Sequence, residues 1–217
     1  MDNKITSSYR HSKGFYDNIM TRATWWSDLY LRIFWQNVDD VEIAGHVLDY
    51  IPDDFDGTIL DVPLGTAIFT SEKYRRLKHA RITGLDYSED MLNIARERLD
   101  GLNIDIMKGD VAALPFPDES FDIVLSMNGF PVFPDKDAAF SETRRVLKKG
   151  GKLLTCFYLK GQSRTTDWLT RNILARKGWM TLPFDDKQKV LERLSPYFEL
   201  DDFHIKGSML YFSATKK

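Results

Sequence analysis

Apolar residues in the first 50 positions recur at steps of three and four, which is the spacing of one face of a helix. Five of them would share such a face: Phe15, Ile19, Trp26, Leu29 and Ile33. The pattern resumes between residues 38 and 51, and Pro52 then begins a segment rich in turn-forming residues. We therefore expect an N-terminal helical cap over residues 1–50.

From residue 57 the pattern changes to short β-rich runs that alternate with amphipathic helices. The expected strands are 58–62, 81–86, 103–107, 121–126 and 152–158, and the expected helices are 66–79, 88–99 and 137–147. Strands that alternate with helices at this spacing predict βαβ units and a mostly parallel sheet. The sequence thus predicts an α/β protein with a Rossmann-like doubly wound sheet.

The C-terminal part of the chain breaks this alternation. Two β-rich runs, 198–205 and 208–215, are separated only by Lys206 and Gly207, a link too short for a parallel crossover. They predict an antiparallel hairpin, which a helix over 186–195 precedes. Residues 160–185 do not fit the repeat, and we interpret them as a helical insertion.

Composition narrows the class of protein. The chain has 217 residues, of which 43% are hydrophobic and 29% charged, a balance typical of a folded globular protein. The single cysteine excludes an internal disulfide, and four scattered histidines predict no metal site. A net charge of −2 gives no general attraction to nucleic acid. The polar start and the lack of a long apolar run predict neither a signal peptide nor a transmembrane segment, so we expect a cytoplasmic protein.

Three acidic residues, Asp61, Asp86 and Asp110, fall at or just after the carboxyl ends of expected strands, where open parallel sheets bind ligands. A tight turn with Gly65 follows the first strand and would let backbone N–H groups approach a ligand. The position of Asp86, 21 residues after Gly65, suits a carboxylate that accepts hydrogen bonds from ribose hydroxyls. Asp110 and the N–H of Val111 could recognise an adenine ring. Together these features predict a nucleoside site.

The loop also indicates which nucleoside ligands do not fit. A dinucleotide site needs the pattern G-x-G-x-x-G, and a P-loop needs GxxxxGK[ST]; neither occurs here. A nucleoside without phosphates and with an amino-acid tail fits the single glycine better.

Four ordered segments carry a family resemblance: ILDVPLGTA, ITGLDYSEDMLNIARERL, MKGDVAALPFPDESFDIVLS and ETRRVLKKGGKLL. They resemble the class I S-adenosylmethionine-dependent methyltransferases, in particular the small-molecule branch (methyltransferase type 11) that includes the quinone C-methyltransferases. The resemblance implies a methyltransferase domain over residues 51–217, S-adenosylmethionine as the cofactor, and methyl transfer to a small apolar or aromatic molecule.

The resemblance also implies roles for individual residues. Asp61 and Gly65 would line the methionine part of the cofactor, Asp86 would hold the ribose diol, and the residues after the fourth strand would face the sulfonium and the acceptor. The full expected cofactor set is Asp61, Pro63, Gly65, Thr66, Asp86, Tyr87, Met91, Gly109, Asp110, Val111, Ser126, Met127 and Asn128.

The chain departs from the family pattern at Pro63 and Ala67, where the family usually has glycine. Proline fixes φ near −65° and removes an N–H donor. Alanine adds a methyl group at a place where we expect a helix to start, which alanine favours. We therefore expect a reshaped cofactor pocket.

Aromatic residues from three segments are expected to wall an acceptor pocket: Tyr16, Trp26, Phe130, Phe133 and Tyr158. Such a pocket suits an apolar or aromatic molecule. No residue in the sequence is identifiable as a catalytic base, so a second hypothesis is a catalytically silent cofactor-binding module that acts as a sensor or partner subunit. Balanced charge argues against an RNA-modifying enzyme.

Four basic residues accompany the apolar stripe of residues 160–180. This stretch is therefore also a candidate for a membrane-surface or dimer helix. The expected partners are a small-molecule acceptor and, through the N-terminal or 160–180 helices, a second copy of the chain. No nucleic-acid partner is expected.

Overall fold

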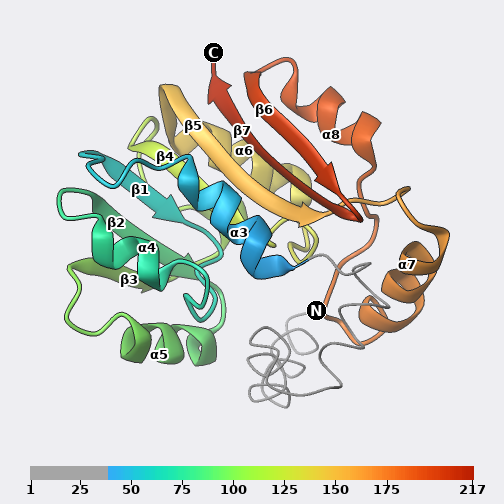
Figure 1. The fold of residues 1–217 in the computed structure, drawn as a ribbon, viewed down its shortest axis with the longest axis horizontal. Helices are drawn as coiled ribbons and strands as arrows, with labels where there is room; N and C mark the ends of the chain where they lie inside the picture. Colours follow the sequence, from blue (N-terminus) through green and yellow to red (C-terminus); the bar gives the residue numbers. More distant parts are fainter. Residues whose placement is uncertain (1–38) are drawn as a thin grey trace.

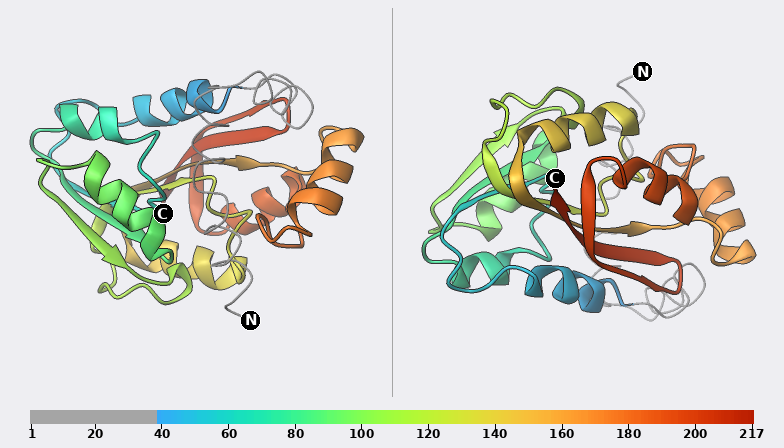
Figure 2. Two further views of the ribbon diagram at one scale, coloured as in Figure 1. Left: turned by 90° about the horizontal axis from the view of Figure 1, so that it is seen from below. Right: turned by 90° about the horizontal axis from the view of Figure 1, so that it is seen from above.

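The computed structural model describes residues 39–217 and consists of a seven-stranded sheet covered by helices on both faces (Figures 1 and 2). The strands are β1 (Thr58–Asp61), β2 (Arg81–Asp86), β3 (Ile104–Lys108), β4 (Phe121–Met127), β5 (Leu147–Tyr158), β6 (Phe198–Lys206) and β7 (Met209–Lys216). The helices are α3 (Asp40–Asp49), α4 (Ser71–Arg76), α5 (Glu89–Arg98), α6 (Lys136–Val146), α7 (Arg164–Leu169) and α8 (Lys187–Leu194), with a 3₁₀ turn η1 (Val111–Ala113) and a π-helix η2 (Thr170–Leu174).

The strand order is β3-β2-β1-β4-β5-β7-β6. Strands β1 to β5 run parallel to one another, and β7 is antiparallel to both β5 and β6. The order of the first four strands reverses at β1, so β1 and β4 lie at the centre of the sheet. The predicted mostly parallel, doubly wound sheet with a C-terminal hairpin is therefore confirmed.

Two hydrophobic clusters hold the helices to the two faces of the sheet. Helices α3, α4 and α5 cover one face, where Ile43 and Leu92 are fully buried. Helices α6 and α8 cover the other face through a group of phenylalanine rings in contact, such as Phe140 against Phe198. Both faces of the central strands are buried, as expected for a parallel sheet.

Side-chain caps fix where several helices begin. Ser88 accepts a hydrogen bond from the N–H of Met91 at the start of α5, and Asp135 caps α6 in the same way through Ala138. Such caps satisfy N–H groups that have no partner within the helix. Because α5 follows the end of β2 almost directly, its cap also fixes the position of the loop between them at the carboxyl edge of the sheet.

The predicted helix over 66–79 is wrong in extent, since α4 begins only at Ser71 and the preceding loop contains two left-handed residues. The predicted helical insertion contains two consecutive helical segments, α7 and the π-helix η2. The predicted cap lies outside the described residues except for its last helix, α3, and its boundary at residue 50 stays a prediction. None of the helices among the described residues is long and apolar enough to cross a membrane.

Candidate cofactor and acceptor site

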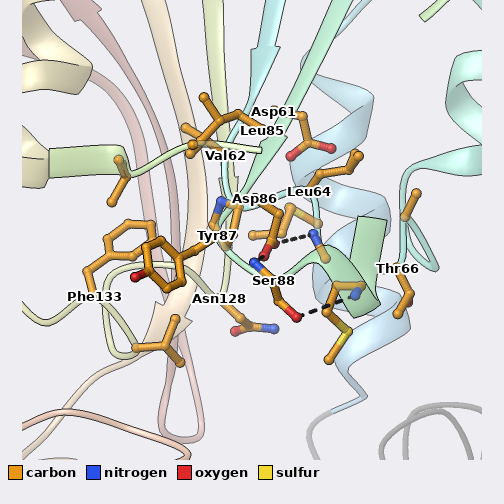
Figure 3. Close-up of a pocket in the computed structure, with 18 of the residues that line it drawn as sticks. Asp61, Val62, Leu64, Thr66, Leu85, Asp86, Tyr87, Ser88, Asn128 and Phe133 are labelled. Carbon is orange, nitrogen blue, oxygen red and sulfur yellow. Dashed lines mark hydrogen bonds between the residues drawn. The ribbon is translucent and has the colours of Figure 1, made fainter. Parts of the chain in front are cut away.

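A cavity of about 490 Å³ opens at the carboxyl edge of the sheet, between the loops that follow β1, β2, β3 and β4 (Figure 3). Its volume lies in the range of small-molecule sites. Every residue of the expected cofactor set except Ser126 lines this cavity. Positions far apart in the sequence therefore meet where the strand order reverses, which is the place where open α/β sheets bind ligands.

Asp86, the last residue of β2, ties two of these loops together. Its Oδ2 accepts a hydrogen bond from the N–H of Gly65 at 2.8 Å, and its Oδ1 accepts one from the N–H of Ser88 at 2.8 Å (Figure 3). Burial raises the pKa of this carboxyl, whereas the N–H groups of Ser88, Gly65 and Tyr87 act in the opposite direction. A carboxylate can accept about four hydrogen bonds and three backbone N–H groups act on this one, so Asp86 is a rigid acceptor with room for a further donor from the cavity.

The loop after β1 adopts an unusual backbone. Gly65 has φ +58° and Ala67 has φ +55°, both in the left-handed region. A side chain at 65 would meet no neighbouring atom, so the backbone angle and not space demands glycine there. Ala67 holds the same conformation with a Cβ, which is strained. The expectation that Ala67 starts a helix is therefore wrong.

Asp61 ends β1 beneath this loop and is fully buried. The hydroxyl of Tyr74 donates to its Oδ2 at 2.7 Å, whereas Oδ1 has no hydrogen-bond partner among the described residues. Burial raises the pKa of Asp61 to about 7, although the hydrogen bond from Tyr74 opposes this. A buried carboxyl oxygen without a donor is costly. The site therefore lacks one donor that a cationic ligand group could supply.

The loop after β3 approaches β2 closely. A Cβ at Gly109 would lie 2.6 Å from the side chain of Leu85, so close packing demands glycine there. Asp110 follows and caps η1, accepting from the N–H of Ala112 at 2.9 Å. Val111 is buried and lines the cavity beside it.

Comparison with known proteins bears on this arrangement. The profile of the methyltransferase domain family matches residues 59–151, from β1 into β5. The demethylmenaquinone methyltransferase of Staphylococcus haemolyticus is 41% identical over 97 residues, which are 44% of this chain and 41% of that protein. This chain therefore matches less than half the length of this curated relative.

Solved structures show how widely the fold is shared. A S-adenosylmethionine-dependent methyltransferase of Thermotoga maritima superposes with a TM-score of 0.70 at 20% identity, covering 98% of this chain and 100% of that one. The [4+2]-cyclase SpnF superposes with a TM-score of 0.62 at 28% identity, covering 80% and 62%. The fold is thus that of the class I S-adenosylmethionine-dependent methyltransferases, and one similar structure is named for a different reaction.

In this fold, the end of β4 separates the loops after β1, β2 and β3 from the remaining wall of the cavity. Met127 and Asn128 line the cavity, and Asn128 has φ +56°. Ser126 does not line it, because its side chain turns into the protein, where a Cβ on Gly129 would lie 2.6 Å from its hydroxyl. Ser126 and Met127 are successive residues of β4, so their side chains point to opposite faces of the sheet, whereas Asn128 lies beyond the end of the strand. A Cβ on Gly129 would also lie 2.5 Å from Pro63, which therefore packs against this loop.

Only part of the expected acceptor pocket is found. Phe133 lines the cavity together with Val132. Phe130 packs among core phenylalanine rings, and Tyr158 is buried with its hydroxyl 2.5 Å from Asp167, so neither lines the cavity. The expected roles of Tyr16 and Trp26 lie outside the described residues.

Thr181 in the insertion also lines the cavity, and no sequence pattern predicted it. Its hydroxyl donates to the carbonyl of Phe133 at 2.6 Å, and its N–H donates to the carbonyl of Pro131 at 2.7 Å. The ammonium of Lys136, which is buried, donates to the Thr181 carbonyl at 2.9 Å and to its hydroxyl at 2.8 Å. These bonds, the Thr181 clamp, fasten the insertion to the loop between β4 and α6.

Burial also lowers the pKa of Lys136 to about 8, and the nearby carboxyl of Asp185 acts against this effect. Asp185 is itself buried and pairs with Arg193 of α8. The clamp therefore continues into a buried polar network between the insertion, α6 and α8. No group of three or more acidic, histidine or cysteine residues suited to a metal ion occurs in the described part of the chain.

Proposed function

We propose that this chain is a S-adenosylmethionine-dependent methyltransferase that acts on a small apolar or aromatic molecule. The observation that carries the proposal is the Asp86 arrangement, in which a buried carboxylate joins the loop of Gly65 to the start of α5 at the cavity. A domain of the methyltransferase family surrounds that arrangement. The named activity of the relatives, methylation of demethylmenaquinone, favours a quinone-like ring as acceptor.

The residues present fit this cofactor. Asp86 can accept a further hydrogen bond from a ribose hydroxyl, and the exposed carboxylate of Asp110 next to buried Val111 suits an adenine edge. Asp61 has a buried Oδ1 without a donor, which the ammonium group of the methionine part would satisfy. We assign cofactor contact to the lining residues of the expected set on these grounds.

The chemistry of the bound cofactor is a methyl group on a sulfonium, ready for in-line displacement. The protein then needs to align the acceptor and keep water away. Phe133 and Val132 form the apolar wall for the acceptor, and Met127 and Asn128 lie between that wall and the cofactor loops. Thr181 closes the wall from the insertion.

Titration calorimetry with S-adenosylmethionine, followed by methyl-transfer assays over a panel of quinones, phenols and amines, tests this function. We expect micromolar binding and turnover on an aromatic acceptor. Binding without turnover on any acceptor would support the silent-module hypothesis, and absence of binding would contradict both. The cytoplasmic location, the dimer contact and the absence of a nucleic-acid partner stay predictions from the sequence.

A further inference from the structure

The insertion between β5 and α8 exposes large apolar side chains. Trp168 of α7 is 60% exposed and Leu182 is 53% exposed. Single exposed apolar residues are common and need no explanation. Here, however, two of the most exposed large apolar side chains among the described residues belong to one short segment. Thr181 lines the cavity and Leu182 follows it directly, so one of these exposed apolar residues is the chain neighbour of a cavity-lining residue.

The same segment is strongly basic. Residues 160–184 contain five basic residues and one acidic residue, a net charge of +4 in a chain whose total is −2. The one acidic residue, Asp167, is already occupied by the Tyr158 hydroxyl and the N–H of Gly161. Arg164, Arg171 and Arg176 are exposed. The exposed basic residues thus belong to the same segment as the exposed apolar side chains.

These three arginines form no ion pair or hydrogen bond with another described residue. By contrast, other arginines such as Arg145 and Arg193 each bind two acidic residues. Guanidinium groups without acidic partners are available to an anionic surface. In all three views α7 projects at one end of the molecule, apart from the helices that cover the sheet (Figures 1 and 2).

We propose that residues 160–184 bind the surface of a membrane that contains anionic lipids. Trp168 and Leu182 would enter the boundary between headgroups and acyl chains, and the three arginines would pair with lipid phosphates. Tryptophan with flanking basic residues is a typical composition of membrane-surface segments. The exposed aliphatic Leu182 favours a lipid surface over a nucleic acid, because a phosphate backbone offers it no apolar contact.

The position of this surface gives it a use that rests on the proposed function. An apolar acceptor dissolved in the bilayer would reach the cavity beside Thr181 without crossing bulk water. The membrane contact itself does not depend on methyl transfer, so it is tested without an acceptor.

Sedimentation of the full-length protein with sucrose-loaded vesicles tests the proposal. We expect binding to vesicles of phosphatidylcholine and phosphatidylglycerol at 3:1, weak binding to pure phosphatidylcholine, and weaker binding as salt rises. Changing both Arg171→Glu and Arg176→Glu should lower the partition coefficient at least about tenfold, since each basic residue near the surface contributes to it. The double variant Trp168→Ser with Leu182→Ser should also have a lower partition coefficient, by the same factor at high and at low salt.

The matched control is Lys78→Glu with Lys149→Glu, which changes the net charge equally at exposed positions on the opposite edge of the sheet. This variant should sediment like the wild type. Circular dichroism and thermal unfolding check that each variant folds. Equal binding to both vesicle types, equal loss in the control variant, no vesicle binding, or retention of a labelled RNA without vesicle binding would each overturn the proposal. Cofactor binding, measured separately, shows whether the proposed function fails as well.

Discussion

The two sides of the cavity are built differently. On the cofactor side, the loops after β1, β2 and β3 are joined by a carboxylate and backbone N–H groups, with Asp86 at the centre. On the acceptor side, Phe133 meets Thr181, and the bonds that join them end mainly on backbone carbonyls. The cofactor side lies within the segment that matches the methyltransferase domain family, whereas Thr181 lies outside it.

This difference explains why one side is readable in a sequence and the other is not. The cofactor side demands particular residue types, because Gly65 must adopt a left-handed backbone and Gly109 must leave room for Leu85. The acceptor side uses donors that bind main-chain carbonyls, which every residue carries. Its wall can therefore change with few constraints from the rest of the fold, as suits a part that selects the acceptor.

The largest effect is expected on the cofactor side, from Asp86→Asn. The substitution keeps the shape of the side chain but removes its charge. It also replaces one oxygen, which accepts a hydrogen bond from a backbone N–H group, by an NH₂ group that can only donate. Hydrogen bonds to charged groups contribute about 1.5–3 kcal/mol, so affinity for S-adenosylmethionine should fall roughly 10- to 150-fold. Calorimetry measures this, with Asp105→Asn on exposed β3 as the control. Affinity within twofold of the wild type would contradict the central role of Asp86.

The two sides meet at Gly129, where Gly129→Ala should destabilise the protein by about 1–3 kcal/mol. The added methyl group would lie 2.5 Å from Pro63 and 2.6 Å from Phe133, one residue from each side. Denaturant unfolding measures the change. The matched control is Gly45→Ala in α3, where a Cβ meets no atom within 4 Å and should stabilise the helix by about 0.5–1 kcal/mol. Equal effects at the two positions would mean that the contact is not tight.

The sequence predicted the sheet and the cofactor side of the cavity better than the acceptor side. The alternation of strands and helices predicted the sheet, and the short link at Gly207 predicted the hairpin, because both follow from chain geometry. The carboxylates at strand ends were found for the same reason. The extent of α4 was missed because alanine gives no signal of a left-handed backbone at Ala67.

On the acceptor side the sequence was a poorer guide. Aromatic residues pack in cores and line pockets alike, so Phe130 and Tyr158 could not be told from Phe133 by residue type. Thr181 is a single threonine in an irregular insertion, and only the folded chain shows that Lys136 and Phe133 reach it. The direction of Ser126 depends on the register at the end of β4, which a sequence pattern fixes only to within a residue or two.

A smaller and more selective effect is expected from Thr181→Val, which keeps the shape but removes the hydroxyl of the clamp. The Phe133 carbonyl then loses a donor and the Lys136 ammonium loses an acceptor. We expect kcat/KM for the acceptor to fall about tenfold, in line with one such bond, while cofactor affinity stays within twofold. Thr181→Ser retains the hydroxyl and should behave like the wild type. A parallel loss of cofactor affinity would show that the two sides are not separable.

The smallest effect concerns pH and Asp61. Burial raises its pKa to about 7 in the folded protein against an ordinary value of 3.8, so between these values the folded state holds a proton that the unfolded state has released. Stability should therefore decrease as pH rises from 4 to 7. Asp61→Asn removes this contribution, so the unfolding free energy of the variant should fall less from pH 4 to 7 than that of the wild type. Asp40, whose pKa burial also raises to about 7, keeps some slope in the variant.

Asp122 provides the control of opposite sign. Although burial opposes it, hydrogen bonds from Lys148 and Thr58 lower the pKa of Asp122 to about 2, so its stabilising contribution is complete by about pH 4. Asp122→Asn should therefore be less stable than the wild type by a constant amount from pH 4 to 7, whereas the difference for Asp61→Asn should change throughout. Denaturant unfolding at four or five pH values separates the two. Parallel curves for Asp61→Asn and the wild type would mean that Asp61 is ionised in the folded protein, and its bare Oδ1 would then attract a cationic ligand more strongly than a neutral carboxyl would.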